Sequence, residues 1–200
     1  MTGSPPTAKP DPERPSPLTE AAWRGLAEAL DGPPSPERLA TALRLLAKWR
    51  AQMLANTIRK RDGDVIGAGP FAGMLYDVAA SEGGYVPRRL GAYEASLAPV
   101  IEDIVATGYP TILDIGCAEG YYAVGLARRM PGTRILAHDS DPRARALCAQ
   151  LAAANRVTDQ LQIGAEIDHA GIDATVSPGM LILCDIEGAE GALLDPDRAP

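Results

Sequence analysis

The sequence contains few lysines and arginines for its acidic content. Its 19 Lys and Arg stand against 26 Asp and Glu, which gives a formal net charge of −7. Non-specific binding to a nucleic-acid backbone needs a surplus of cations on at least one face, so we expect no nucleic-acid partner. The basic run Arg59, Lys60 and Arg61 is typical of the solvated end of a helix, and a local basic patch is the alternative.

Cysteine is also scarce, and long apolar runs are missing. The three cysteines, Cys117, Cys148 and Cys184, are odd in number and show no zinc or CxxC spacing, so we expect reduced thiols. No apolar run approaches the roughly 18 to 20 residues that span a bilayer. Residues 1–17 lack the apolar core of a secretory signal. The expectation is a cytoplasmic protein with no membrane partner.

Proline and glycine divide the first half of the chain. Residues 1–17 are rich in proline and polar side chains, and we expect a disordered tail because they bury too little apolar surface. A helical N-terminal extension with a glycine-rich loop is expected over residues 18–108. Its predicted helices are 19–30 with Thr19 as N-cap, 36–59 with Ser35 as N-cap, and 92–107. Residues 62–92 are predicted to form an ordered loop with short pieces of structure.

The pattern changes after Gly108 to short apolar strands that alternate with helices. Such alternation indicates an α/β fold, a parallel sheet covered by helices, over residues 109–200. The predicted strands are 111–115, 134–138, 161–164 and 180–184. The predicted helices are 121–129 and 142–155, and Asp141 is the expected N-cap of the second.

A glycine turn follows the first of these strands. Residues 114–120 read DIGCAEG, in which Gly116 and Gly120 allow a sharp turn and a close approach of the backbone to a ligand. The GxGxxG of dinucleotide-binding proteins is missing, so a nicotinamide-dependent oxidoreductase is disfavoured. Asp114, in front of the turn, and Glu119 would not help to bind a phosphate. An acid before the turn suits a ligand with a positive amino-acid group, such as S-adenosylmethionine.

Further acidic residues follow the next two strands. Asp139 ends the second strand and can accept hydrogen bonds from both hydroxyls of a ribose, whereas Asp141 is the helix cap. Glu166 lies just past the third strand, either at the rim where adenine would bind or as a solvated loop acid. His138, inside the second strand, is expected at the rim rather than as a base; His169 is the other histidine.

Three segments resemble those of a known family. Residues 112–120 are similar to motif I of class I methyltransferases, and residues 137–142 to their motif II. Residues 181–190 resemble the DxEGxE strand end of the FkbM family, and residues 69–74 and 90–94 resemble lead-in segments of its bacterial members. The resemblance implies a Rossmann-like methyltransferase that uses S-adenosylmethionine to methylate a hydroxyl of a small molecule or glycan. The implied cofactor-binding residues are Asp114, Gly116, Cys117, Ala118, Gly120, Asp139, Ser140 and Glu166.

The chain departs from this family in the number of strands. The family's sheet has seven strands in the order 3-2-1-4-5-7-6, and this sequence supplies four, in the expected order 3-2-1-4 with the C-terminal strands missing. Its fourth strand would then be an apolar edge, which natural proteins avoid. We favour a longer gene product. An oligomeric partner over that edge and an inactive protein are the alternatives, and the oligomeric state stays open.

Asp185, at the end of the fourth strand, is the candidate catalytic residue. Methyl transfer needs alignment, and a base only where a hydroxyl must lose its proton. Asp185, Glu187 and Glu190 are weak candidates for a divalent cation, but the two glutamates are better explained as caps of the next helix, so no metal is predicted. The competing hypothesis is a non-catalytic protein that binds S-adenosylmethionine or a nucleotide on half of a Rossmann core. Four more residues are expected near the ligand: Tyr93 and Glu94 closing over it, and Tyr121 or Tyr122 beside its methionine end.

Overall fold

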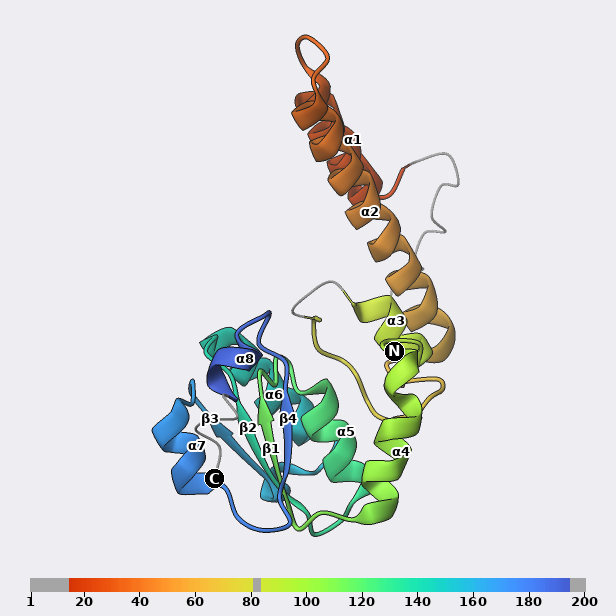
Figure 1. Ribbon diagram of the computed structural model, residues 1–200. Coiled ribbons are helices and arrows are strands. Elements are labelled where there is room, and N and C mark those ends of the chain that lie inside the picture. The colour runs from red at the N-terminus through yellow and green to blue at the C-terminus, as the bar shows by residue number, and fades with distance from the viewer. Residues whose placement is uncertain (1–14, 81–83, 195–200) are drawn as a thin grey trace, which may run out of the picture. The chain divides into compact units, whose positions relative to one another are not determined.

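The computed structural model describes residues 15–80 and 84–194 (Figure 1). The chain forms two compact units, Met1–Thr57 and Ile58–Pro200. The predicted disordered tail lies, up to residue 14, outside the described residues, and its last residues already belong to the start of a helix. Among the helices of the described ranges, none combines the length and the apolar character that crossing a membrane requires.

The first unit is built from α1, Pro17–Leu30, and most of α2, Pro36–Asp62. The predicted N-cap Thr19 is wrong: Ser16 accepts a hydrogen bond from the Thr19 backbone N–H at 3.2 Å, because Pro17 suits the first helical position. Ser35 caps α2 as predicted, accepting from the Arg38 N–H at 3.3 Å. The two helices are joined by a hydrogen bond from Trp49 Nε1 to Thr19 Oγ1 at 3.3 Å.

The second unit begins with the end of α2, and short helices follow before the sheet. These are α3, Tyr85–Leu90, the 3-10 turn η1, Ala95–Leu97, and α4, Ala98–Thr107. The helix predicted over residues 92–107 therefore begins only at Ala98. The reason is Pro99, which has no backbone N–H to donate and is tolerated only in the first turn of a helix.

The sheet of the second unit confirms the predicted α/β fold. Its strands are β1, Thr111–Ile115, β2, Arg134–His138, β3, Leu161–Gly164, and β4, Leu181–Cys184. All pairs are parallel, and the order β3-β2-β1-β4 is the predicted one. The connecting elements are α5, Tyr121–Arg129, α6, Pro142–Ala154, η2, Thr158–Gln160, and α7, His169–Thr175, and α8, Glu190–Leu193, follows β4.

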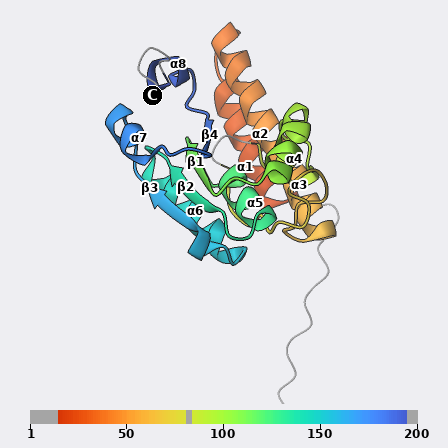
Figure 2. The ribbon, with the colours of Figure 1, turned by 60° about the horizontal axis from the view of Figure 1, so that its bottom comes forward.

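Both faces of this sheet are covered by helices (Figure 2). Alternate residues of β1 point to opposite faces, so Ile112 packs with α4, α5 and α6, while Leu113 packs with α7 and α8. Side chains of the glycine-rich loop, among them Phe71 and Met74, join the first of these cores. We retain the predicted boundaries at residues 17 and 108 as a proposal for the domain organisation. The boundary at residue 17 follows the proline-rich composition, and the boundary at residue 108 follows the change to alternating strands and helices. The core, however, includes residues from both sides of residue 108.

Candidate functional site

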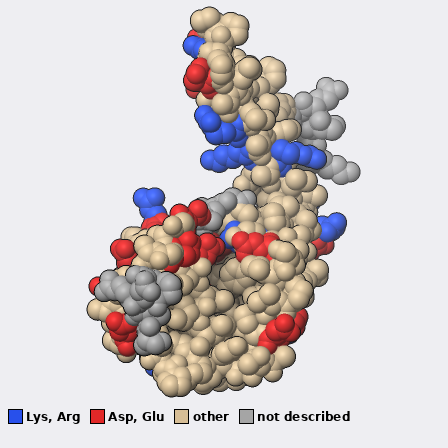
Figure 3. All heavy atoms as spheres, in the orientation of Figure 1, with Lys and Arg blue, Asp and Glu red and all other residues tan. Residues whose placement is uncertain are grey.

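Two cavities open at the carboxyl ends of the strands, where ligands bind in open parallel sheets. The first cavity has a volume of about 570 Å³ and the second about 400 Å³. Both are lined by four residues that lie between them: Gly116, Ala118, Asp185 and Glu187. Acidic side chains gather on this face of the molecule, with a basic one between them (Figure 3). A ligand that spans both cavities would cross the glycine turn.

The glycine turn is fixed to the neighbouring strands. The backbone N–H groups of Gly116 and Cys117 both donate to the carbonyl oxygen of His138, at 2.8 and 3.0 Å. Gly116 has a φ of +84°, and a Cβ there would lie 1.8 Å from the carbonyl oxygen of Asp185. At Gly120, with φ +91°, a Cβ would lie 2.7 Å from Cys148 Sγ. Gly116 faces both cavities, whereas Gly120 lines neither and allows α5 to approach α6.

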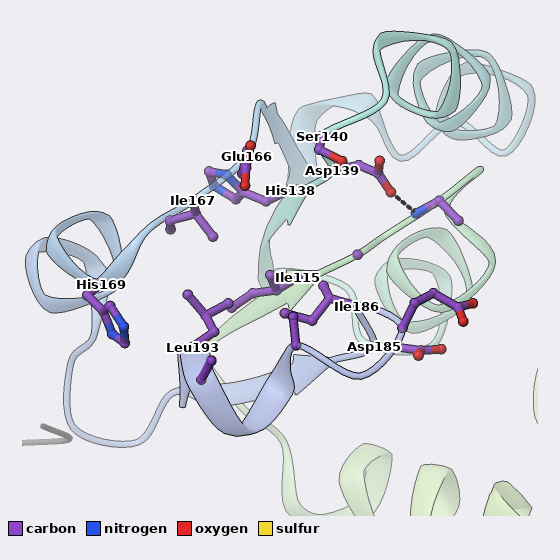
Figure 4. Close-up of a pocket in the computed structure, with 15 residues that line it drawn as sticks. Ile115, His138, Asp139, Ser140, Glu166, Ile167, His169, Asp185, Ile186 and Leu193 are labelled. Atoms are coloured by element: carbon purple, nitrogen blue, oxygen red, sulfur yellow. Dashed lines mark hydrogen bonds between the residues drawn. The ribbon is translucent and has the colours of Figure 1, made fainter. Parts of the chain in front are cut away.

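Asp139 ties the same turn to the end of β2. Its Oδ2 accepts from the Ala118 N–H and its Oδ1 from the Asp141 N–H, both at 2.8 Å (Figure 4). Each carboxylate oxygen keeps a second lone pair for a ligand donor. Asp141 accepts from the Arg143 N–H and caps α6, as predicted.

The rest of the first cavity combines a polar side with an apolar one. Asp139, Ser140, His138 and Glu166 line one side (Figure 4). The ring of His138 is held at the rim, since its Nδ1–H donates to the Ala165 carbonyl at 2.7 Å. The apolar lining comes from β1, from α8 and from the segments that follow β3 and β4, and it includes Ile115, Ile167, Ile186 and Leu193. A planar, partly polar group would fit between these sides.

Asp114 is a buried acid of the site whose pKa is raised. It lines the second cavity and is 5% exposed. Burial raises the pKa of Asp114 to about 7, and the nearby Asp139 and Asp185 carboxylates add to the increase. Within the described residues, its Oδ2 has no hydrogen-bond partner. A buried carboxylate with an unpaired oxygen is costly unless a donor or cation reaches it.

Glu119 lines the second cavity as Asp114 does, but its carboxylate is bonded within the protein, whereas the sequence suggested that the two acids share a role. Its side chain is fully buried and accepts a 2.5 Å hydrogen bond from the Tyr76 hydroxyl. Arg88 Nε lies 3.2 Å from the same carboxylate oxygen. Glu119 therefore belongs to an internal ion pair. Arg88, which lines the second cavity, was missed because the glycine-rich loop and the short helix after it show no periodic pattern.

Three tyrosines and a glutamate line one part of the second cavity. Tyr93 and Glu94 precede η1, and Tyr121 and Tyr122 begin α5. Tyr121 is buried with its ring centroid 5.5 Å from that of Tyr93, and the Tyr122 hydroxyl donates to Glu94. Both tyrosines of α5 thus reach the cavity, whereas the sequence predicted only one of them there.

Backbone strain gathers at this cavity. Three non-glycine residues that line it, Glu94, Ala118 and Glu187, have φ between +45° and +58°. Such conformations cost of order 1–3 kcal/mol each and cluster at ligand sites. This signal cannot be read from the sequence, in which no shared motif surrounds the three residues.

Asp185 lies where the two cavities meet and is an exposed residue. Partial desolvation of its carboxyl group raises its pKa, the carboxylates of Glu94, Glu187 and Glu190 raise it further, and Arg88 lowers it. Glu190 accepts from the N–H groups of Ile186 and Gly188, at 2.8 and 3.2 Å, so it caps the turn before α8. In the described part of the chain, no three acidic, histidine or cysteine side chains form a metal-binding group. That Asp185, Glu187 and Glu190 bind no metal stays a prediction.

Comparisons with known proteins were made with the sequence and with the fold. No family model matches the sequence. It is 30% identical over 117 residues to a release factor glutamine methyltransferase of Cereibacter sphaeroides, an alignment that covers 58% of this chain and 39% of the relative. The chain thus spans about two fifths of the length of that curated relative.

Solved structures with a similar fold include two O-methyltransferases. One is TomG from Streptomyces achromogenes in complex with SAM, with 17% identity, a TM-score of 0.42, and coverage of 70% of this chain and 54% of that one. The other is from Bacillus cereus in complex with SAH, with 13% identity, a TM-score of 0.41, and coverage of 89% and 67%.

Proposed function

We propose that this chain binds S-adenosylmethionine and is a methyltransferase or the cofactor-binding part of one. The observation that carries the proposal is Asp114, a buried carboxylate with an unpaired oxygen beside a backbone turn that separates two cavities. The ligand such a site needs has a cation at one end and hydrogen-bond donors at the other. The methyltransferase relative and the SAM-bound TomG agree with this cofactor.

In this proposal, each of the two cavities binds one part of the cofactor. The ribose hydroxyls are assigned to the free lone pairs of Asp139, and the adenine to the space lined by Ser140, Glu166 and Ile167. The ammonium of the methionine end is assigned to Asp114 in the second cavity. The acidic lining of both cavities disfavours phosphates, which argues against a nicotinamide dinucleotide.

Asp185 is the residue we assign to the acceptor. Bound S-adenosylmethionine supplies an electrophilic methyl group, so the protein must align the acceptor and exclude water. The raised pKa of Asp185 makes it a better proton acceptor for a hydroxyl than an ordinary aspartate. We therefore propose O-methylation of a small molecule or glycan by an enzyme similar to the FkbM family, on the strength of the 185–190 motif.

Calorimetric titration of the chain with S-adenosylmethionine, with NAD as comparator, tests this proposal. We expect saturable binding of S-adenosylmethionine alone. Asp139→Ala should weaken it by about 10-fold or more, because the ribose loses an ionised acceptor. The exposed Asp103 on α4 lines neither cavity, so Asp103→Ala should bind as the wild type does.

Two outcomes would contradict it. One is no binding of S-adenosylmethionine by a chain that circular dichroism shows to be folded. The other is NAD binding of equal strength. Binding without methyl transfer in a screen of hydroxyl acceptors would instead favour the non-catalytic binding protein.

A further inference from the structure

The guanidinium of Arg88 is a buried cation inside an acidic cavity. Arg88 belongs to α3, lines the second cavity and is only 4% exposed. Among the described residues that line either cavity, it is the sole lysine or arginine. Charged groups are rarely buried to this extent unless they are paired or bind something.

The pairing of Arg88 within the protein is incomplete. Its Nε lies 3.2 Å from Glu119 Oε1, an oxygen that also accepts from Tyr76. Its Cζ lies over the Tyr93 ring, 3.9 Å from the ring centroid, so the guanidinium also makes a cation–π contact. Nε and Nη1 are buried and find no hydrogen-bond partner among the described residues. Glu119 thus balances the positive charge of Arg88 but leaves N–H donors of its guanidinium without an acceptor.

The other charged residues of the second cavity are acids: Glu94, Asp114, Asp185 and Glu187, with Glu119 already paired. An anionic group of a ligand is therefore repelled everywhere in this cavity except at Arg88. The guanidinium fork matches a carboxylate in geometry and binds it through two parallel hydrogen bonds.

We propose that Arg88 is the carboxylate-binding residue of the second cavity. Together with Asp114, which suits an ammonium, it forms a site for a ligand end that carries both charges, as an α-amino acid does. This deepens the proposed function, because S-adenosylmethionine has such an end. A carboxylate on the methyl acceptor is the other source of the same chemistry, and the experiment has an arm for each.

The first arm compares S-adenosylmethionine with its decarboxylated form, which keeps the ammonium and the sulfonium. In calorimetric titrations, the wild type should bind the carboxylate-bearing ligand about 10- to 100-fold more tightly, and Arg88→Gln should bring this ratio close to one. Arg143→Gln, which alters an exposed arginine of α6, should leave the ratio unchanged. The ratio isolates the carboxylate, since a general loss of structure would weaken both ligands alike.

Removing Arg88 alone takes the guanidinium away from the buried Glu119 carboxylate, and that variant can fail to fold. The double variant Arg88→Gln/Glu119→Gln removes both charges of the pair and keeps groups of similar size. It should fold, as judged by circular dichroism, and should also lose the preference. A double variant that keeps the wild-type preference would show that Arg88 does not bind the cofactor's carboxylate.

The second arm uses benzoate as a carboxylate probe and benzyl alcohol as its uncharged control. Titrations followed by NMR are run on the free chain and on the chain saturated with S-adenosylmethionine. Benzoate that binds the saturated chain in an Arg88-dependent way assigns the residue to the acceptor. Benzoate that binds only the free chain assigns it to the cofactor. The proposal is overturned if neither the cofactor preference nor benzoate binding depends on Arg88. Because benzoate is tested on the free chain, that result does not require S-adenosylmethionine to bind.

Discussion

Gly116→Ala is expected to lower the free energy of unfolding by more than about 4 kcal/mol. Single substitutions rarely cause so large a loss of stability. The new Cβ would lie 1.8 Å from the carbonyl oxygen of Asp185 and 2.8 Å from its carbonyl carbon. Both atoms are backbone and cannot rotate away. Because Asp185 N–H donates to the Ile115 carbonyl at 2.9 Å, β4 would have to separate from β1 to make room. Binding in both cavities should be lost with it.

Gly132→Ala is the matched control, since it separates the steric effect from the backbone strain. Gly132 has a φ of +94°, in the same left-handed region as Gly116, but a Cβ there would meet nothing within 4 Å. We expect it to cost only about 1–2 kcal/mol. Urea unfolding followed by circular dichroism measures both. Equal losses in the two variants would mean that the turn can move away from Asp185, and that the close packing of β1 against β4 is not essential.

The sheet could be predicted because its signals are local. β1, β2 and β3 are short apolar runs, each closed by a turn residue, and their bounds agree with the structure. The cap at Asp141 is equally local. The two helix starts that were predicted wrongly, those of α1 and α4, have a common cause. In each case a nearby proline decides where the helix begins. Ser16 replaced Thr19 as a cap because proline follows it, and α4 begins late because of Pro99.

The candidate site was predicted only where the two motifs, residues 112–120 and 137–142, contain it. Asp114, Gly116, Ala118 and Asp139 meet at one turn, as the alternation of strand and helix implies. Arg88 reaches the same place from a segment without periodicity, and its partner Glu119 looked like a ligand-facing acid. Contacts between positions so far apart in the chain depend on tertiary packing. Residue types and spacing alone do not reveal them.

Asp114→Asn should make the empty protein more stable above pH 7 while weakening S-adenosylmethionine binding by about 10- to 100-fold. The pKa of this carboxyl is raised to about 7 in the folded chain, from 3.8 in the absence of its surroundings. The folded state therefore binds more protons than the unfolded state between these two values. Stability falls as the pH rises through this window, and the full loss, on the order of 4 kcal/mol, is present above pH 7. Asparagine cannot ionise and removes that loss.

The ligand should reverse the same pH dependence. A ligand ammonium stabilises the ionised form of Asp114, so binding between about pH 5 and 7 should release a proton from it and grow stronger as the pH rises. Calorimetry in two buffers of different ionisation enthalpy measures that proton, and Asp114→Asn should abolish it. Asp103→Asn, at an exposed position of α4, should keep the wild-type release of a proton.

An Asp114→Asn chain that is less stable when empty, yet binds S-adenosylmethionine as tightly as the wild type, would show that the carboxylate serves the fold. If the empty Asp114→Asn chain is more stable than the wild type and binds S-adenosylmethionine more weakly, the unpaired oxygen of Asp114 serves a ligand. A carboxylate with a purely structural role would stabilise the empty protein, and its removal would lower the stability.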